Sequence, residues 1–272
     1  MNAKIFLSAF TLICLFNSCT EKSKQDIDRV DSLKAKSKVI MAIFAHPDDE
    51  TTIGPVLAKY GKENEVYLVV ATDGSFGVTD HAGISAGDSL ITIRTKETEC
   101  ASEKLGIKPP HFLDAQDGLG LNGHGNFYEE IPVLKESIKD KIEELKPTTI
   151  VTFGPDGDTG HPDHRLVGLL TTEILLREDW ANEIDLYFFG WTKKQAAKFP
   201  KWNLGYVHEN MLKTKIKFSA EDEEKAFASM RCHKSQFSEE EFKSWIAAEK
   251  EDTTNILHFR KFIPDNTERN AF

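Results

Sequence analysis

Two short motifs place histidine and aspartate at spacings that suit a metal ion. The first motif reads AHPDDE at residues 45–50, and the second reads GHPDH at residues 160–164. Zinc accepts imidazole nitrogen and carboxylate oxygen, and catalytic zinc sites combine three protein ligands with a water molecule. Two histidines with one carboxylate therefore predict a centre that activates water.

Spacing assigns a role to each residue of the motifs. His46 and Asp49 are three residues apart, and the proline between them sets a turn that lets both face one point, so we expect both to bind the metal. Asp48 then points toward the bound water, which makes it the candidate general base. His164 is the candidate third ligand. His161, three residues earlier on the same turn, can lie beside a substrate carbonyl.

A purely structural interpretation of the motifs is also open. Asp48 or Asp49 could cap the helix expected near residue 50, and Asp163 could cap its own helix, because aspartate stabilises a helix N-terminus. Either motif alone is compatible with capping. The pair favours a site, because capping would leave two exposed histidine–carboxylate clusters at the ends of predicted strands unexplained.

The elements that must position these residues follow from hydrophobic patterning. Residues 39–45 form a continuous apolar run, which is typical of a strand buried on both faces, and residues 65–72 and 148–153 are predicted to be further buried strands. Further strands are predicted at residues 111–113, 185–189 and 256–262, and helices at residues 50–59, 88–105, 129–146, 163–177, 220–232 and 239–249. This alternation predicts an α/β fold with a mostly parallel sheet, helices on both faces and a site at the carboxyl ends of the strands.

Residue spacing also predicts which face of two helices turns inward. The helix at 129–146 carries its apolar stripe at Ile131, Leu134, Ile138, Ile142 and Leu145. The helix at 88–105 is expected to turn inward with Ile91, Thr95, Thr98 and Leu105.

The motifs resemble the PIG-L/LmbE family of zinc-dependent deacetylases. Further segments that fit are ATDG at residues 71–74, Arg94 with Glu97, and MRCHKSQ at residues 230–236, so that the resemblance runs from about residue 38 to about residue 240. It implies a Rossmann-like three-layer fold, one zinc ion and removal of the acetyl group from an N-acetylglucosamine unit.

The same resemblance implies roles for single residues. It matches His46, Asp49 and His164 to the metal ligands and Asp48 to the catalytic base. His161 matches the histidine that assists at the oxyanion or the leaving group. Arg94 and Asp117 lie where the family contacts its sugar.

Other activities stay open at this point. Family members often carry an acidic residue after the aspartate–glycine pair at 73–74, where this chain has Ser75, and the family includes amidases that act on other conjugates. An amidase acting on a non-sugar N-acyl conjugate is therefore an alternative, as is a catalytically silent glycan-binding lipoprotein. Other divalent metals could also occupy a site built from nitrogen and oxygen ligands.

The N-terminal residues indicate export. Lys4 precedes an apolar run at residues 5–16, which has the length of a signal-peptide core, and Cys19 follows a small residue. We expect a lipoprotein signal at residues 1–18, a polar tether at 19–37 and the deacetylase-like domain at 38–272. A lipidated Cys19 would anchor the protein to the membrane of a bacterial cell envelope, facing the periplasm or the surface. An ordinary secretory signal with an incidental cysteine is the alternative.

The acidic composition limits the classes of partner that the protein can bind. The 272 residues carry a formal net charge of −10, which argues against binding nucleic acid, because phosphate recognition needs a basic face. An N-acetylated sugar and the membrane are the expected partners. Cys100 and Cys232 could pair in an oxidising compartment, although the sequence does not decide it. His233 is interpreted as a structural residue that ties the C-terminal helices to the site.

Overall fold

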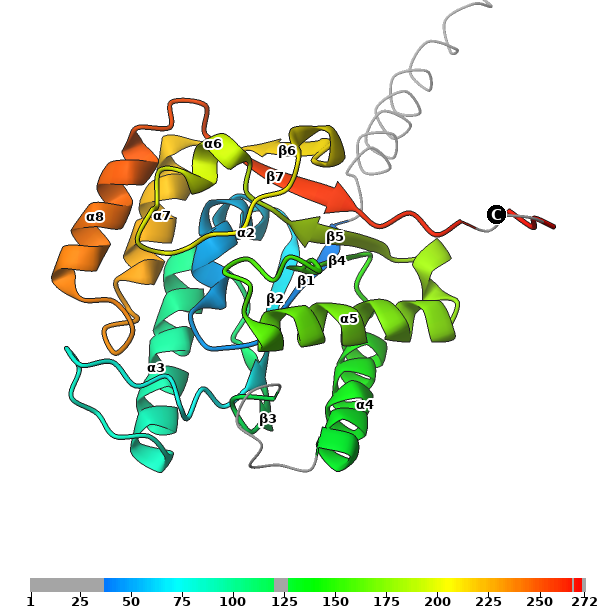
Figure 1. Cartoon of the computed structure of the whole chain (residues 1–272), viewed down its shortest axis with the longest axis horizontal. Coiled ribbons are helices and arrows are strands. Elements are labelled where there is room, and N and C mark those ends of the chain that lie inside the picture. Colours follow the sequence, from blue (N-terminus) through cyan, green and yellow to red (C-terminus); the bar gives the residue numbers. More distant parts are fainter. Residues whose placement is uncertain (1–36, 120–126, 266, 271–272) are drawn as a thin grey trace, which may run out of the picture. The chain divides into compact units, whose positions relative to one another are not determined.

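The computed structural model describes residues 37–119, 127–265 and 267–270, and a seven-stranded sheet in the order β3-β2-β1-β4-β5-β7-β6 runs through this part of the chain (Figure 1). The strands are β1 (Val39–Phe44), β2 (Glu65–Thr72), β3 (His111–Ala115), β4 (Thr149–Phe153), β5 (Asp185–Phe189), β6 (Thr214–Lys217) and β7 (Ile256–Lys261). Strands β1 to β5 pair in parallel, whereas β7 runs antiparallel to β5 and β6. The predicted α/β fold with a mostly parallel sheet is confirmed.

Helices cover both faces of the sheet (Figure 1). They are α2 (Gly54–Gly61), α3 (Asp88–Leu105), α4 (Phe127–Leu145), α5 (Pro162–Arg177), α6 (Lys193–Ala196), α7 (Ala220–Met230) and α8 (Glu239–Lys250), with short 3-10 turns at Asp49–Ile53, Trp180–Asn182 and Glu209–Met211. Helices α2, α7 and α8 share one core with Ile40 and Phe44 of β1, and α4 and α5 share the other core with Met41 and Ile43. Successive residues of β1 therefore face different cores, which explains its unbroken apolar run.

The predicted face of α4 is confirmed, and that of α3 is wrong in part. On α4, Ile138 is fully buried within the expected stripe. On α3, Thr98 is buried as expected, but Ile91 and Thr95 are only half-buried, and Arg94 lies between them on the buried side. The inward face of α3 runs through Leu90, Arg94 and Thr98 to Leu105, so a charged side chain lies within an otherwise uncharged buried stripe.

The C-terminal third contains elements that the apolar pattern missed. Helices α7 and α8 and strand β7 lie where they were predicted, but β6 and α6 were not anticipated. Strand β6 has only four residues, and two of them are exposed lysines. Its apolar content is therefore too low for the hydrophobic pattern to predict a strand. Trp191 and Trp245 are buried and pack around Phe199, which makes them part of the core.

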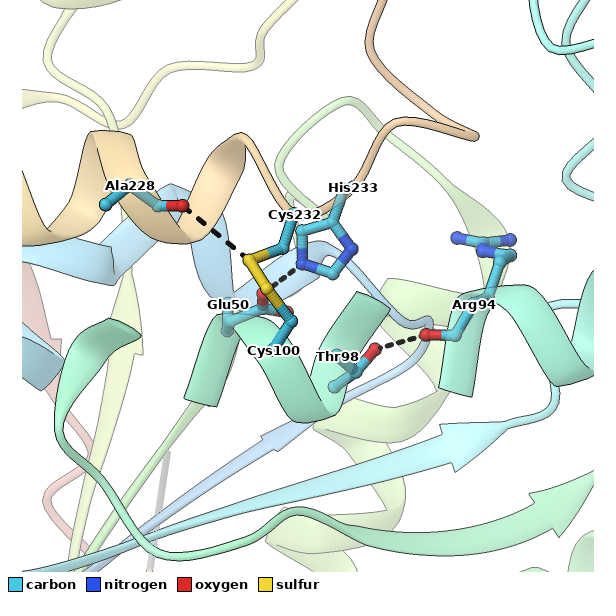
Figure 2. The surroundings of a disulfide bond; sticks show 7 residues. All are labelled: Glu50, Arg94, Thr98, Cys100, Ala228, Cys232 and His233. Carbon is cyan, nitrogen blue, oxygen red and sulfur yellow. Dashed lines mark hydrogen bonds and ion pairs between the residues drawn. A yellow bond between two sulfur atoms is a disulfide. The ribbon is translucent and has the colours of Figure 1, made fainter. Parts of the chain in front are cut away.

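A disulfide joins Cys100 on α3 to Cys232, just beyond the end of α7 (Figure 2). Residues Lys38–Phe272 form one compact unit, and the predicted domain boundaries stay a prediction. The predicted signal at residues 1–18, with Cys19 and nearly all of the tether, lies outside the described residues. None of the helices in the described ranges is long and apolar enough to span a bilayer.

Candidate metal centre

Both motifs meet at the carboxyl ends of β1 and β4, the edge at which a parallel sheet was expected to carry a site. A pocket of about 370 Å³ opens there. It is lined by His46, Asp48, Asp49, Phe76, Gly77, Arg94, Asp117, Gly118, His161, His164 and Gln236. All seven residues selected from the sequence therefore line one cavity.

Three donor groups form a compact triangle in this pocket. His46 Nδ1 lies 3.2 Å from His164 Nε2, which lies 3.1 Å from Asp49 Oδ1, and Asp49 Oδ2 lies 3.6 Å from His46 Nδ1. Ligands bound tetrahedrally at about 2.0–2.1 Å from a zinc ion are roughly 3.3 Å apart. The His46–His164 and His164–Asp49 distances therefore fit a zinc ion, whereas the 3.6 Å distance to His46 is measured from Asp49 Oδ2, the oxygen that the backbone amides hold.

Hydrogen bonds fix which atom of each candidate ligand faces the triangle. His164 Nδ1 donates to the Gly157 carbonyl at 3.1 Å, which leaves Nε2 as the free donor atom. His46 Nε2 lies 3.3 Å from both Asp117 Oδ1 and Asp163 Oδ2, which leaves Nδ1 free. A carboxylate or carbonyl behind a metal-binding imidazole fixes its tautomer and raises its basicity.

Asp49 is held by backbone amides. The N–H groups of Ala45 and His46 donate to Oδ2 at 3.0 and 2.8 Å, so Oδ1 is the oxygen directed at His164. Burial alone would raise the pKa of Asp49, but charge attraction and hydrogen bonds from the two histidines lower it well below its usual value. The carboxylate is therefore ionised, as a metal ligand must be.

Two other groupings of donor atoms lie within 4.8 Å of one another: His46 with His161 and His164, and His46 with Asp117 and Asp163. The second grouping uses the Nε2 side of His46, where the carboxylates orient the ring. The assignment of His46, Asp49 and His164 as the ligands stays a prediction, and the triangle above favours it.

Asp48 lies beside the triangle in an unusual backbone conformation. Its φ is 110°, in the left-handed region that residues other than glycine seldom adopt. Arg94 Nη2 donates to Asp48 Oδ1 at 3.2 Å and also to the Pro47 carbonyl, and Nη1 donates to the Gly74 carbonyl. Burial raises the pKa of Asp48 to about 6, although the charge of Arg94 opposes the shift.

Arg94 is 2% exposed, and the loop after β2 is shaped around it. A Cβ at Gly77 would lie 2.1 Å from Nη1 of Arg94, so glycine is required for the guanidinium to fit. The polar contacts of Arg94 go to the Asp48 loop and to Gly74. A sugar contact by Arg94 or Asp117 stays a prediction.

His161 is half-buried, and its ring centre lies 4.7 Å from that of His46. The backbone N–H of Asp163 donates to His161 Nδ1 at 3.2 Å, so Nε2 carries the proton when the ring is neutral. Burial, followed by the neighbouring histidines His46 and His164, lowers the pKa of His161. A neutral ring with a proton on Nε2 can still donate a hydrogen bond.

Sequence reasoning missed two buried acids that support the site. Asp163 is fully buried against His46 and accepts from the Gly118 N–H at 3.0 Å; the cap of α5 is His161 instead. Glu50 bonds to His233, which confirms that His233 ties the C-terminal segment to the site. The rule that a carboxylate stands behind a metal-binding histidine could have indicated Asp163.

The segment after α7 is fixed to the site by further bonds. The N–H and hydroxyl groups of Ser235 donate to the carboxylate of Glu97 on α3, and Gln236 donates from Nε2 to the Gly77 carbonyl at 2.9 Å. Gln236, the last residue of the MRCHKSQ segment, therefore lines the pocket.

Known proteins are similar to this chain in sequence and in fold. The PIG-L family, described as GlcNAc-PI de-N-acetylase, matches residues 41–175. A 1D-myo-inositol 2-acetamido-2-deoxy-alpha-D-glucopyranoside deacetylase of Mycolicibacterium vanbaalenii is 28% identical over 203 residues, covering 67% of this chain and 68% of that protein. A second deacetylase of that name, from Catenulispora acidiphila, is 31% identical over 48% of each chain.

Solved structures show the same architecture. N,N'-diacetylchitobiose deacetylase from Pyrococcus horikoshii superposes with a TM-score of 0.62 at 21% identity, covering 93% of this chain and 95% of that one. At this identity the likeness concerns the fold.

Proposed function

We propose, from the premise that this chain belongs to the PIG-L family, that it is a metal-dependent hydrolase which removes the N-acetyl group from a glycan or glycoconjugate containing N-acetylglucosamine. The observation that carries the proposal is that Asp48 lies beside three convergent metal-type donors in a single pocket. A binding protein without chemistry would need neither the donor triangle nor a carboxylate of raised pKa.

Zinc is the proposed ion, held by His46, Asp49 and His164. When bound, it supplies a Lewis acid that lowers the pKa of water toward about 7. The chain itself contributes the fixed orientation of the ligands, because Gly157 and Asp163 hold the outer nitrogens of both imidazoles.

Asp48 is proposed as the general base. Its pKa of about 6 keeps the carboxylate mostly ionised at neutral pH yet basic enough to take a proton from the attacking water. Arg94 binds Oδ1, so we assign the transferred proton to Oδ2. The same group can then return the proton to the leaving amine.

His161 is proposed to polarise the amide. Its Nε2–H, fixed by the hydrogen bond at Nδ1, can donate to the carbonyl oxygen as negative charge develops there. Because burial and the neighbouring histidines lower the pKa of His161, the neutral ring is the form proposed to donate this hydrogen bond.

The substrate class is inferred from the relatives. The two curated relatives named above are deacetylases of an acetamido-sugar linked to inositol, and the chitobiose deacetylase has the same fold. Phe76 lines the pocket and offers an aromatic surface of the kind that stacks on sugar rings.

A panel of N-acetyl compounds tests this proposal. The zinc-loaded protein is incubated with an N-acetylglucosaminyl inositol, N,N'-diacetylchitobiose and N-acetylated amines that lack a sugar, and the released acetate is measured with and without chelator. Chelator-sensitive release from the sugars alone is expected. Release from the non-sugar amines alone would establish the amidase alternative, and no release from any compound would favour the silent binding protein.

We also propose that the protein acts outside the cytoplasm, anchored through Cys19. The apolar run before this cysteine supports export, and the Cys100–Cys232 disulfide is typical of an oxidising compartment. Mass spectrometry of the protein purified from its own membranes should find a diacylglycerol on an N-terminal Cys19, and a free N-terminus at another residue would contradict the anchor.

A further inference from the structure

The backbone of Asp48 requires outside support. A residue other than glycine held at a φ of 110° is strained, and such a conformation persists only where neighbouring groups hold it. The backbone dihedrals of Asp48 set the direction of its carboxylate. Groups that bind the Asp48 main chain therefore control where the proposed base points.

Glu50 provides that support from beneath. Its Oε2 accepts the N–H of Asp48 at 3.2 Å, and its Oε1 is bonded to His233 Nε2. Both Glu50 and His233 are fully buried. His233 thus fixes one oxygen of Glu50 while the other oxygen holds the amide of Asp48.

Arg94 provides support from the opposite side. It binds the Asp48 carboxylate and the Pro47 carbonyl, and it comes from the middle of α3. The position of Asp48 therefore depends on two segments far apart in the sequence: α3 and the residues that follow α7.

The disulfide joins these two segments. Cys100 lies on α3 six residues after Arg94, and Cys232 directly precedes His233 (Figure 2). The bonds of Ser235 to Glu97 reinforce the same connection. Figure 2 shows the hydrogen bond between Glu50 and His233 together with the disulfide. Arg94 lies on the same helix as Cys100, α3, about two turns nearer its N-terminus.

We infer that Glu50 and His233 are positioning residues for Asp48 and that the Cys100–Cys232 disulfide holds this support in register with Arg94. The inference rests on the proposed function, because it concerns the base of that reaction. The expected signature is a loss of kcat with little change in KM or in bound zinc, since neither residue touches the substrate or the ion.

Two substitutions at Glu50 separate positioning from simple stability. Glu50→Ala removes the acceptor for the Asp48 amide, and we expect kcat to fall about 10- to 100-fold at unchanged KM and zinc content, as a misplaced group does. Glu50→Gln keeps an oxygen for the Asp48 N–H and an amide for His233, so kcat should return to within a few-fold of wild type. Equal losses in both variants would overturn the inference.

Asp222→Asn is the matched control. Asp222 is also buried, but it caps the start of α7 and pairs with Lys62, far along the helix from His233. Its substitution should lower the melting temperature and leave kcat unchanged. If Asp222→Asn lowers kcat as strongly as Glu50→Ala does, stability alone explains the effect and the inference fails.

The disulfide and the backbone are tested by two further measurements. The double variant Cys100→Ser/Cys232→Ser, assayed where it is folded, should lose kcat several-fold at unchanged KM; an unchanged kcat would overturn the role of the disulfide. A crystal structure of Glu50→Ala should show Asp48 released from its positive φ. An Asp48 unmoved in that crystal would overturn the positioning role even if the wild-type protein deacetylates nothing, so the two failures are distinguishable.

Discussion

Asp48 combines a raised pKa, a guanidinium partner and a backbone held in the left-handed region. Burial of the carboxyl and the positive φ are each unfavourable for folding, because the carboxyl is kept from water and the chain is bent against its preference, whereas the charge of Arg94 partly offsets the burial. Together they direct one carboxylate at the space beside His46, Asp49 and His164. Such a concentration of unfavourable features is typical of a catalytic group.

Removing the charge of Asp48 should abolish turnover and spare the metal. Asp48→Asn keeps the size of the side chain and tolerates a positive φ, but the amide cannot accept the proton, so we expect kcat to fall by about 10²- to 10⁴-fold. Bound zinc, measured by atomic emission, should stay at the wild-type level. Asp114→Asn is the control, because Asp114 is an exposed aspartate with a φ of 52°. Wild-type kcat in Asp48→Asn would refute the assignment.

The site was predictable where its residues are close in the sequence. His46, Asp48 and Asp49 stand within four positions directly after a strand, and their types alone indicate metal chemistry. Glu50 and His233 each lie in a motif, but they are 183 residues apart, and their contact exists only after α7 has packed beside α2. Partners in such buried networks depend on tertiary packing, which a single sequence does not display.

At the scale of elements, helix α5 connects the second motif to the sheet. It begins at Pro162, directly after His161, and its residues Val167 and Leu170 pack in the core shared with α4. Gly168 lies against β4 so closely that an added Cβ would meet the Phe153 carbonyl oxygen at 2.1 Å. The close approach of helix and strand therefore fixes His164, one turn earlier.

Gly168→Ala tests this close approach. In an exposed helix the change would stabilise by about 1 kcal/mol, because alanine has the higher helix propensity. Here we expect a destabilisation of about 1–3 kcal/mol, since α5 must move away from β4, and weaker zinc binding as His164 moves with it. Urea unfolding and a zinc titration measure both effects. Leu169→Ala is the control, because the neighbouring Leu169 is 56% exposed, and it should change neither the free energy of unfolding nor the affinity for zinc. A Gly168→Ala protein with wild-type stability and zinc affinity would show that the close approach of α5 to β4 is not needed.

The elements themselves were largely predictable, and the exceptions have physical reasons. The high apolar content of β1, β2 and β4 is a strong signal because most residues on both faces of these strands are buried. The face of α3 was misjudged because Arg94 is directed inward, which hydrophobic spacing cannot indicate. Strand β6 is short and half exposed, so its existence follows from pairing with β7.

For the whole molecule, stability should depend on a half-buried carboxyl that catalysis does not use. Burial raises the pKa of Glu249 on α8 to about 7, and the nearby charges of Glu223 and Asp252 add to the shift. Because this pKa lies above the unfolded value of 4.5, folding favours the protonated form. The stability that protonated Glu249 contributes to the folded protein is fully present below about pH 4.5 and is lost as the pH rises through about 7.

Glu249→Gln should therefore stabilise the protein only at higher pH. We expect a gain of about 1–2 kcal/mol in the free energy of unfolding at pH 8 and almost none at pH 4.5, because the amide cannot ionise. Urea denaturation at the two pH values measures the difference. Glu251→Gln, at an exposed position nearby, serves as control and should change neither value. A gain of equal size at both pH values would show that the effect is not ionisation.

The central claim is that one metal ion, bound by His46, Asp49 and His164, makes this protein a deacetylase. Its most direct test is a zinc titration of chelator-treated protein in which bound zinc and acetate released from N,N'-diacetylchitobiose or an N-acetylglucosaminyl inositol are followed together. The account predicts no release without metal, a linear rise to one zinc per chain and a plateau beyond, with His164→Ala binding no zinc and releasing no acetate. Release by the metal-free protein, or full activity in His164→Ala, would contradict it.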